Sequence, residues 1–254
     1  MGVHPALSVR DLGHAYGGAP VLDGVSFDAG AGEVVAVIGP SGAGKTTLFR
    51  CATAVIRPRQ GHIEVEGRDL SRLGPADLRR ARQAMGLVYQ HYNLVRRLSA
   101  LDNVLVGRLA HVPTWRVLLR RVGSKERSLA LECLERVGLA HLAGARSDTL
   151  SGGQQQRVAI ARALAQRSRL ILADEPVASL DPASAASVLA TLRSVAAEEG
   201  IAVVCSLHQI DLVPGFADRV VALRGGRLVL DIPAGQLGPE HRATVYGADG
   251  LVQQ

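Results

Sequence analysis

The sequence has few cysteines, and it contains no apolar run long enough to cross a membrane. Its 254 residues include Cys51, Cys133 and Cys205, whose spacing fits neither a metal site nor a disulfide framework. We therefore expect buried thiols in a reducing compartment. Residues 1–10 lack the apolar segment of a signal peptide, and no apolar run approaches the roughly eighteen residues of a membrane span. These absences predict a chain that stays in the cytoplasm.

Lysine is also scarce, because only Lys45 and Lys125 are lysines among the 29 basic residues. The arginines are scattered, with small clusters at 79–80, 96–97 and 120–121, and the net charge is +6. This distribution favours a solvated or membrane-facing surface, and nucleic-acid binding stays open as an alternative. The scarcity makes Lys45 informative, because a compact ammonium suits a phosphate-binding loop better than a planar guanidinium does.

Short apolar runs alternate with segments of helical periodicity along most of the chain. Continuous apolar runs predict strands buried on both faces at 34–38, 170–173, 201–205 and 220–223. Residues 7–27 and 62–65 read as further strands. Helical patterns occupy 45–55, 129–137, 154–165 and 184–197, and the mostly helical region 92–166 forms a second lobe. Strands that alternate with helices predict an α/β fold with a parallel sheet covered on both sides.

A glycine-rich segment directly follows the first buried strand, and it matches G-x-x-x-x-G-K-[ST] between a strand and a helix. This P-loop, residues 39–47, reads Gly39, Pro40, Ser41, Gly42, Ala43, Gly44, Lys45, Thr46 and Thr47. Glycines let backbone N–H groups turn toward phosphate oxygens, and the helix N-terminus adds partial positive charge. We expect Lys45 to contact the β- and γ-phosphates of a nucleoside triphosphate, and the Thr46 hydroxyl to ligate Mg²⁺.

Two adjacent carboxylates end the apolar run at 170–173. We expect Asp174 to hold Mg²⁺, directly or through water, and Glu175 to polarise the water that attacks the phosphate. Phosphoryl transfer asks the protein mainly for positioning and charge stabilisation, and one carboxylate for metal and one for water meet that need. Together with the P-loop, this pair predicts an ATPase.

A third motif, which we call the signature segment, comprises Leu150, Ser151, Gly152, Gly153 and Gln154. With the P-loop and the carboxylate pair, it resembles the nucleotide-binding domain of ABC transporters over nearly the whole chain. The resemblance implies a head-to-tail homodimer in which two ATP molecules lie between one subunit's P-loop and the other's signature segment. The residue types suit this arrangement, because Ser151 and the glycines begin a helix whose free N–H groups can bind a γ-phosphate. A P-loop kinase, the alternative, leaves this segment without a purpose.

The resemblance also implies a fold and a division of the chain. The fold is an α/β P-loop NTPase of the ABC type, a mostly parallel core sheet with an N-terminal antiparallel β subdomain and an α-helical subdomain. All 254 residues form one ABC ATPase domain. Residues 1–90 and 167–254 make the RecA-like core with the β subdomain, and residues 91–166 make the helical subdomain that carries the signature segment.

Four single positions match the family's pattern outside these motifs. Tyr16 resembles the aromatic residue that stacks on adenine. Gln90 lies at the glutamine-loop position, where the family senses Mg²⁺ and water and couples to the membrane partner. Asp181 resembles the residue that crosses the dimer interface. His208 resembles the switch histidine that contacts the γ-phosphate and belongs to the catalytic set with Glu175 and Lys45.

The sequence shows no fused membrane helices, no second cassette, no inserted coiled coil and no regulatory domain. In these respects the chain resembles a minimal importer subunit. Such a subunit is peripheral, at the cytoplasmic face of the inner membrane, as a homodimer on integral membrane permease subunits that receive cargo from a substrate-binding protein. A soluble ABC ATPase that acts on nucleic acid is the less favoured alternative, and we expect no nucleic-acid partner.

Finer resemblance points to phosphonate importers, with phosphite and phosphate open as other cargoes. It rests on the segments 89–99, 103–109, 173–182 and 207–212, on Gln209 after the switch histidine, and on Trp115. The chain departs from the pattern at Tyr89, where phenylalanine is more usual. It also departs at Pro214-Gly215, which interrupts an expected helix because proline removes a helix hydrogen bond.

Overall fold

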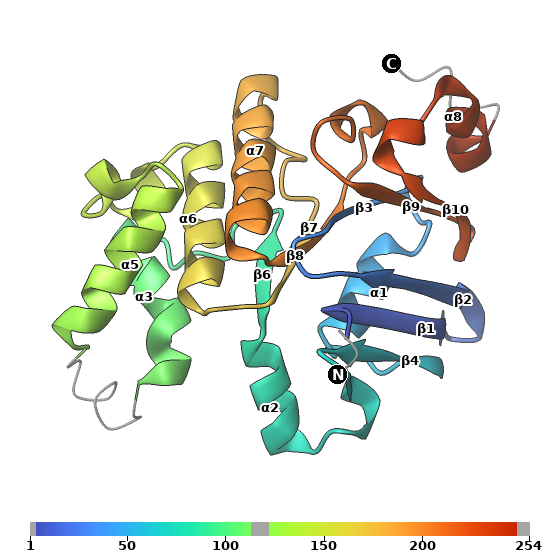
Figure 1. The fold of residues 1–254 in the computed structure, drawn as a ribbon, viewed down its shortest axis with the longest axis horizontal. Helices are drawn as coiled ribbons and strands as arrows, with labels where there is room; N and C mark the ends of the chain where they lie inside the picture. The colour runs from blue at the N-terminus through green and yellow to red at the C-terminus, as the bar shows by residue number, and fades with distance from the viewer. Residues whose placement is uncertain (1–3, 113–121, 248–254) are drawn as a thin grey trace.

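The computed structural model describes residues 4–112 and 122–247 (Figure 1). Trp115 and the arginine pair at 120–121 lie outside the described residues. Within the described ranges, no helix is long and apolar enough to cross a membrane.

The larger sheet has six strands in the order β10-β9-β3-β8-β7-β6. Its four central strands correspond to the four predicted apolar runs, and β6 and β10 are strands that the sequence analysis did not predict. All neighbours pair in parallel except β9 and β10. The strands are β3 (Val34–Ile38), β6 (Met85–Tyr89), β7 (Leu170–Asp174), β8 (Ala202–Ser206), β9 (Arg219–Arg224) and β10 (Arg227–Pro233).

The smaller sheet is antiparallel and lies at the N-terminal side, as the resemblance implies. Its order is β2-β1-β4-β5. The strands are β1 (Leu7–Tyr16), β2 (Ala19–Ala29), β4 (Gln60–Val65) and β5 (Arg68–Asp69).

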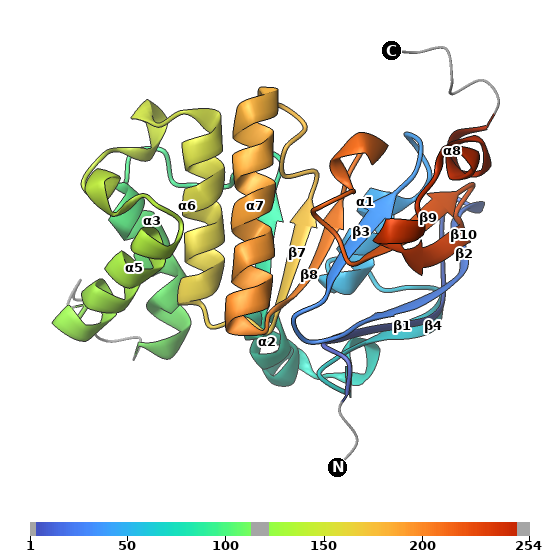
Figure 2. The ribbon, with the colours of Figure 1, turned by 45° about the horizontal axis from the view of Figure 1, so that its top comes forward.

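Helices cover both sheets and form a lobe at one end of the larger sheet (Figures 1 and 2). The lobe holds α3 (Ala100–Arg108), α5 (Ser124–Arg136) and α6 (Gly152–Ala165), and α7 (Pro182–Glu199) lies between α6 and the sheet's centre. The other helices are α1 (Lys45–Ala52), α2 (Pro75–Gln83) and α8 (Pro239–Tyr246). Short 3₁₀ helices are 70–72, 109–111, 140–142, 147–149, 210–212 and 234–236.

Several predicted helix boundaries are wrong by a few residues. Helix α5 begins five residues earlier than predicted, and α7 ends two residues later. Three other boundaries have a local reason. Ser151 and Asp181 act as N-caps, so α6 and α7 begin two residues earlier than predicted. Helix α1 ends at Ala52, because Ala54 adopts a positive φ of 54°. No helix runs through Pro214-Gly215, where only a 3₁₀ helix at 210–212 precedes the turn.

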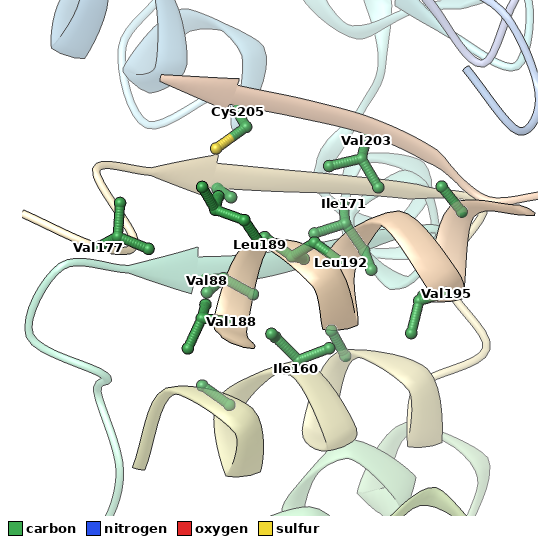
Figure 3. Close-up of a cluster of buried hydrophobic side chains, with 14 of the residues drawn as sticks. Val88, Ile160, Ile171, Val177, Val188, Leu189, Leu192, Val195, Val203 and Cys205 are labelled. Carbon is green, nitrogen blue, oxygen red and sulfur yellow. The ribbon is translucent and has the colours of Figure 1, made fainter. Parts of the chain in front are cut away.

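The two faces of the larger sheet bury different hydrophobic clusters. Successive side chains of a strand point to opposite faces, so Val34, Ala36 and Ile38 join the cluster under α6 and α7, while Val35 and Val37 face the N-terminal sheet and α1. Figure 3 shows Ile160 of α6 beside Val188 and Leu192 of α7 beneath the strands. Truncating such a buried isoleucine to alanine costs about 2–5 kcal/mol. The core therefore fixes the carboxyl ends of β3, β7 and β8.

Candidate functional site

The predicted motifs meet at the carboxyl ends of neighbouring parallel strands. The P-loop follows β3, the carboxylate pair ends β7, and His208 follows β8, which lies between those two strands. Ligands of open α/β sheets bind at this edge.

Two P-loop glycines are required by close backbone approaches. Gly39 has a φ of 150°, and a Cβ there would lie 2.2 Å from the carbonyl oxygen of Leu223. Gly44 has a φ of 101°, and a Cβ would lie 2.7 Å from the carbonyl oxygen of Val21. Any side chain would therefore displace the backbone of β2 or β9.

Lys45, the first residue of α1, is buried with its ammonium at the centre of the loop. Its Nζ donates to the carbonyl oxygens of Gly39, at 2.6 Å, and Pro40, at 3.2 Å. Burial lowers the pKa of Lys45, and the nearby carboxylates of Glu175 and Asp174 oppose that shift. The ammonium thus lies between the phosphate-binding loop and the carboxylate pair.

A cavity of about 300 Å³ lies over the P-loop. It is lined by the loop itself and by three residues from other elements. Those residues are Val21, Glu175 and His208, and the loop contributes residues 41–47. The side chain of Thr46 is exposed there, so its hydroxyl is accessible to a ligand.

Ser206, the last residue of β8, holds both carboxylate residues. Its hydroxyl donates to Asp174 Oδ1 at 2.8 Å and accepts from the Glu175 N–H at 2.9 Å. Burial raises the pKa of Asp174, and the neighbouring Glu175 raises it further, whereas the Ser206 hydrogen bond and Lys45 lower it. Ser206 is fully buried, and the sequence analysis missed its role.

Glu175 and His208 contact each other at the edge of the cavity. His208 Nε2 lies 2.6 Å from Glu175 Oε1, and 41% of the histidine side chain is exposed. Glu175 has a φ of 51°, a left-handed conformation that turns the chain sharply after β7. A contact this exposed contributes little to stability, so either group can exchange the other for a ligand.

The signature segment opens α6, away from this cavity. Ser151 is the N-cap, accepting from the Gln154 N–H at 3.3 Å, while Gln154 Oε1 accepts from the Ser151 N–H at 2.9 Å. A Cβ on Gly152 would lie 2.7 Å from the Tyr92 hydroxyl, and one on Gly153 would lie 3.1 Å from Ser184 Cβ. The signature residues are not among those lining the cavity.

Gln90 directly follows β6, whose last residue pairs in register with Asp174. The next residues turn through two left-handed conformations, with φ of 59° at Tyr92 and 48° at Asn93. Arg162 of α6 stabilises this turn by donating to the carbonyl oxygens of Asn93, at 2.6 Å, and Tyr92, at 3.2 Å. The glutamine loop, residues 90–98, is thereby tied to the helix that carries the signature segment.

Tyr16 and Asp181 lie outside the cavity. Tyr16 ends β1 with 44% of its surface exposed, and its ring packs edge-on against His14. Asp181 is exposed and caps α7, accepting from the Ser184 N–H at 3.0 Å, and hydrogen bonds from Ser184 lower its pKa. Val21 lines the cavity although no motif marked it, because it comes from β2 of the other sheet.

The chain is similar to a known protein family and to named transport proteins. Residues 22–178 match the family described as ABC transporter. The chain is 46% identical over 255 residues to the hypophosphite import ATP-binding protein of Stutzerimonas stutzeri, covering 94% of this chain and 75% of that protein. It is 47% identical over 232 residues to a phosphonates import ATP-binding protein of Nostoc sp., covering 91% of this chain and 87% of that protein.

Solved structures resemble the fold over almost the whole chain. The ABC transporter component cbiO1 of Clostridium perfringens superposes with a TM-score of 0.81 at 27% identity, over 97% of this chain and 92% of that chain. A dimeric ATP-binding cassette in a post-hydrolysis state with ADP and Pi superposes with a TM-score of 0.75 at 30% identity, over 90% of this chain and 98% of that chain.

Proposed function

The chain belongs to the ABC transporter family, and from that premise we propose that it is the ATP-hydrolysing subunit of an importer for phosphonates or a related phosphorus oxyanion. The proposed class of cargo rests on one observation. The chain is 42–47% identical to relatives named for the import of phosphonates or hypophosphite. Hypophosphite, phosphite and phosphate are therefore the alternative cargoes.

The geometry of the cavity supports a division of roles in hydrolysis. The backbone N–H groups of the P-loop and the Lys45 ammonium bind the β- and γ-phosphates, because the loop is shaped around Lys45 and opens into the cavity. Glu175 orients and polarises the attacking water, and His208 contacts the γ-phosphate. Their 2.6 Å contact supports this assignment by placing both groups at the same end of the cavity.

The residues near the phosphates also fit Mg²⁺. Thr46, Asp174 and Gln90 offer the oxygen donors that this ion prefers. The raised pKa of Asp174 supports the fit, because a cation would offset the partial burial of this carboxylate and its repulsion from Glu175. When bound, Mg²⁺ neutralises phosphate charge as it develops during hydrolysis.

A homodimer completes the site in this proposal. The signature segment of one subunit, with Asp181 beside the interface, closes over the ATP held by the P-loop of the other, and Tyr16 stacks on adenine. The glutamine loop transmits closure to integral membrane permease subunits at the cytoplasmic face of the membrane, and a substrate-binding protein delivers cargo to them. No nucleic acid takes part.

Growth on a single phosphorus source tests the proposal. A strain that lacks this protein is supplied with the native chain or with Glu175→Gln, and each strain is grown on a phosphonate, hypophosphite, phosphite or phosphate. We expect the native chain alone to restore growth on the phosphonate. Normal growth of the deletion strain on the phosphonate, with a defect on another source, would keep the importer and reassign its cargo. Equal rescue by both forms would contradict a need for hydrolysis.

A further inference from the structure

The last helix of the chain reaches back to the catalytic edge, although none of the motifs includes it. The hydroxyl of Tyr246, at the end of α8, donates to the carbonyl oxygen of His208 at 3.0 Å. Tyr246 is partly buried, and this burial raises the pKa of its phenol. The phenol oxygen therefore contacts the backbone of the residue assigned to the γ-phosphate.

Helix α8 is held in place by contacts of three residues that precede Tyr246. Arg242 forms an ion pair with Asp211, three residues after His208. Arg224, at the end of β9, donates to the carbonyl oxygen of Thr244 at 3.0 Å. Val245 is fully buried in the cluster under the larger sheet. These contacts fix the helix, so Tyr246 is presented to His208 by a rigid support.

The backbone just before His208 is held by a hydrogen bond to β3. The preceding Leu207 N–H donates to the carbonyl oxygen of Val37 at 3.0 Å, which fixes the entry to the loop. The side chain of His208 is 41% exposed, so packing alone does not hold it. The Tyr246 hydrogen bond holds the carbonyl group of His208. The backbone is therefore held both before and after the histidine side chain.

We propose that Tyr246 is a positioning residue for His208, so that its hydroxyl orients the histidine toward Glu175 and the γ-phosphate. The inference rests on the role proposed for His208. Helix α8 then supports the hydrolytic site through this one side chain.

Steady-state ATP hydrolysis by Tyr246→Phe, His208→Ala and the double variant tests this inference. Phenylalanine keeps the ring and removes only the hydroxyl. We expect Tyr246→Phe to lower kcat by about three- to tenfold, the effect of one positioning hydrogen bond, with KM for ATP unchanged within about twofold. In the His208→Ala background, the same substitution should change kcat by less than about twofold, because the group it positions is gone.

Thr244→Ala is the matched control on the same helix. Only the backbone carbonyl of Thr244 is used by Arg224, so this variant should keep the native kcat. A native kcat for Tyr246→Phe would overturn the inference, as would an equal loss with and without His208. A native kcat for His208→Ala would instead overturn the role proposed for that histidine, whatever Tyr246→Phe shows. Melting temperatures of all variants separate lost positioning from lost folding.

Discussion

Asp174 and Glu175 are adjacent in sequence, yet the structure gives them different environments. Asp174 is half-buried at the end of β7 and accepts from Ser206, while Glu175 turns into the cavity toward His208. A buried carboxylate without a cation destabilises the folded chain, which is the physical meaning of its raised pKa. The left-handed backbone conformation of Glu175 thus directs two adjacent carboxylates into different surroundings.

Asp174→Asn should raise the melting temperature of the nucleotide-free protein by a few degrees at pH 7. The amide keeps an Oδ1 acceptor for Ser206 and removes the buried charge. A carboxyl group with a raised folded pKa favours the fold at low pH, and that contribution is lost as the pH rises through its folded pKa. The advantage of the variant should therefore shrink as the pH falls toward the ordinary carboxyl pKa of about 4.

The same variant should lose the additional stabilisation that Mg²⁺ gives in the presence of ATP. Thermal unfolding at several pH values, with ATP alone and with Mg²⁺ and ATP, measures both effects. Asp77→Asn, at an exposed position of α2 where Asp77 pairs with Arg80, is the control. It should lower the melting temperature at most slightly, because an exposed pair contributes about 0–1 kcal/mol, and it should leave the effect of Mg²⁺ unchanged. A lower melting temperature for Asp174→Asn at pH 7 would contradict this interpretation of Asp174.

Among the elements, helix α6 combines two tasks at its N-terminus. Ser151 caps the helix within a capping box, which is a structural role, and it is also the residue proposed to meet the γ-phosphate of the other subunit. Further along, Arg162 ties the same helix to the glutamine loop. A movement of α6 is therefore communicated to residues 90–98 through hydrogen bonds to backbone.

Replacing Ser151 with other capping residues separates the two tasks. Aspartate and asparagine cap helices about as well as serine, whereas alanine costs about 1 kcal/mol, or about 2–4 °C in a chain of this size. Ser151→Asp and Ser151→Asn should keep the native melting temperature, and Ser151→Ala should lower it. Only Ser151→Asp should abolish ATP-dependent dimerisation, because its carboxylate opposes the γ-phosphate.

Sedimentation with a slowly hydrolysed ATP analogue, together with thermal unfolding, measures both properties of these variants. Ser151→Asn is the neutral control for the added charge. Full dimerisation of Ser151→Asp would show that this residue does not face the γ-phosphate.

At the scale of the whole molecule, the core of the fold could be predicted because its strands are buried on both faces. Continuous apolar runs at 34–38 and 170–173 leave a strong pattern, whereas β10 alternates exposed and partly exposed residues and lies at an edge. Helix α8 is short and carries few apolar residues, so its periodicity did not distinguish it from a loop. The boundaries of α6 and α7 required the capping residues to be recognised.

The site was predictable where chemistry restricts the sequence to a motif, as in the P-loop. The sequence analysis missed three residues for a common reason, namely Ser206, Val21 and Tyr246. Each of them reaches the candidate site through contacts between segments that are distant in the sequence. No spacing in the sequence reports that Tyr246 returns to His208. The only sequence signal for Ser206 was its position two residues before His208.

The central claim is that two copies of this chain close around ATP and that Glu175 drives their reopening by hydrolysis. The most direct test is light scattering after size-exclusion chromatography of Glu175→Gln with and without Mg²⁺ and ATP, alongside its hydrolysis rate. We predict hydrolysis slowed by at least about 100-fold, the mass of a dimer only with ATP, and a monomer when Ser151→Asp is added. A variant that hydrolyses ATP at the native rate, or that binds ATP and remains a monomer, would contradict the account.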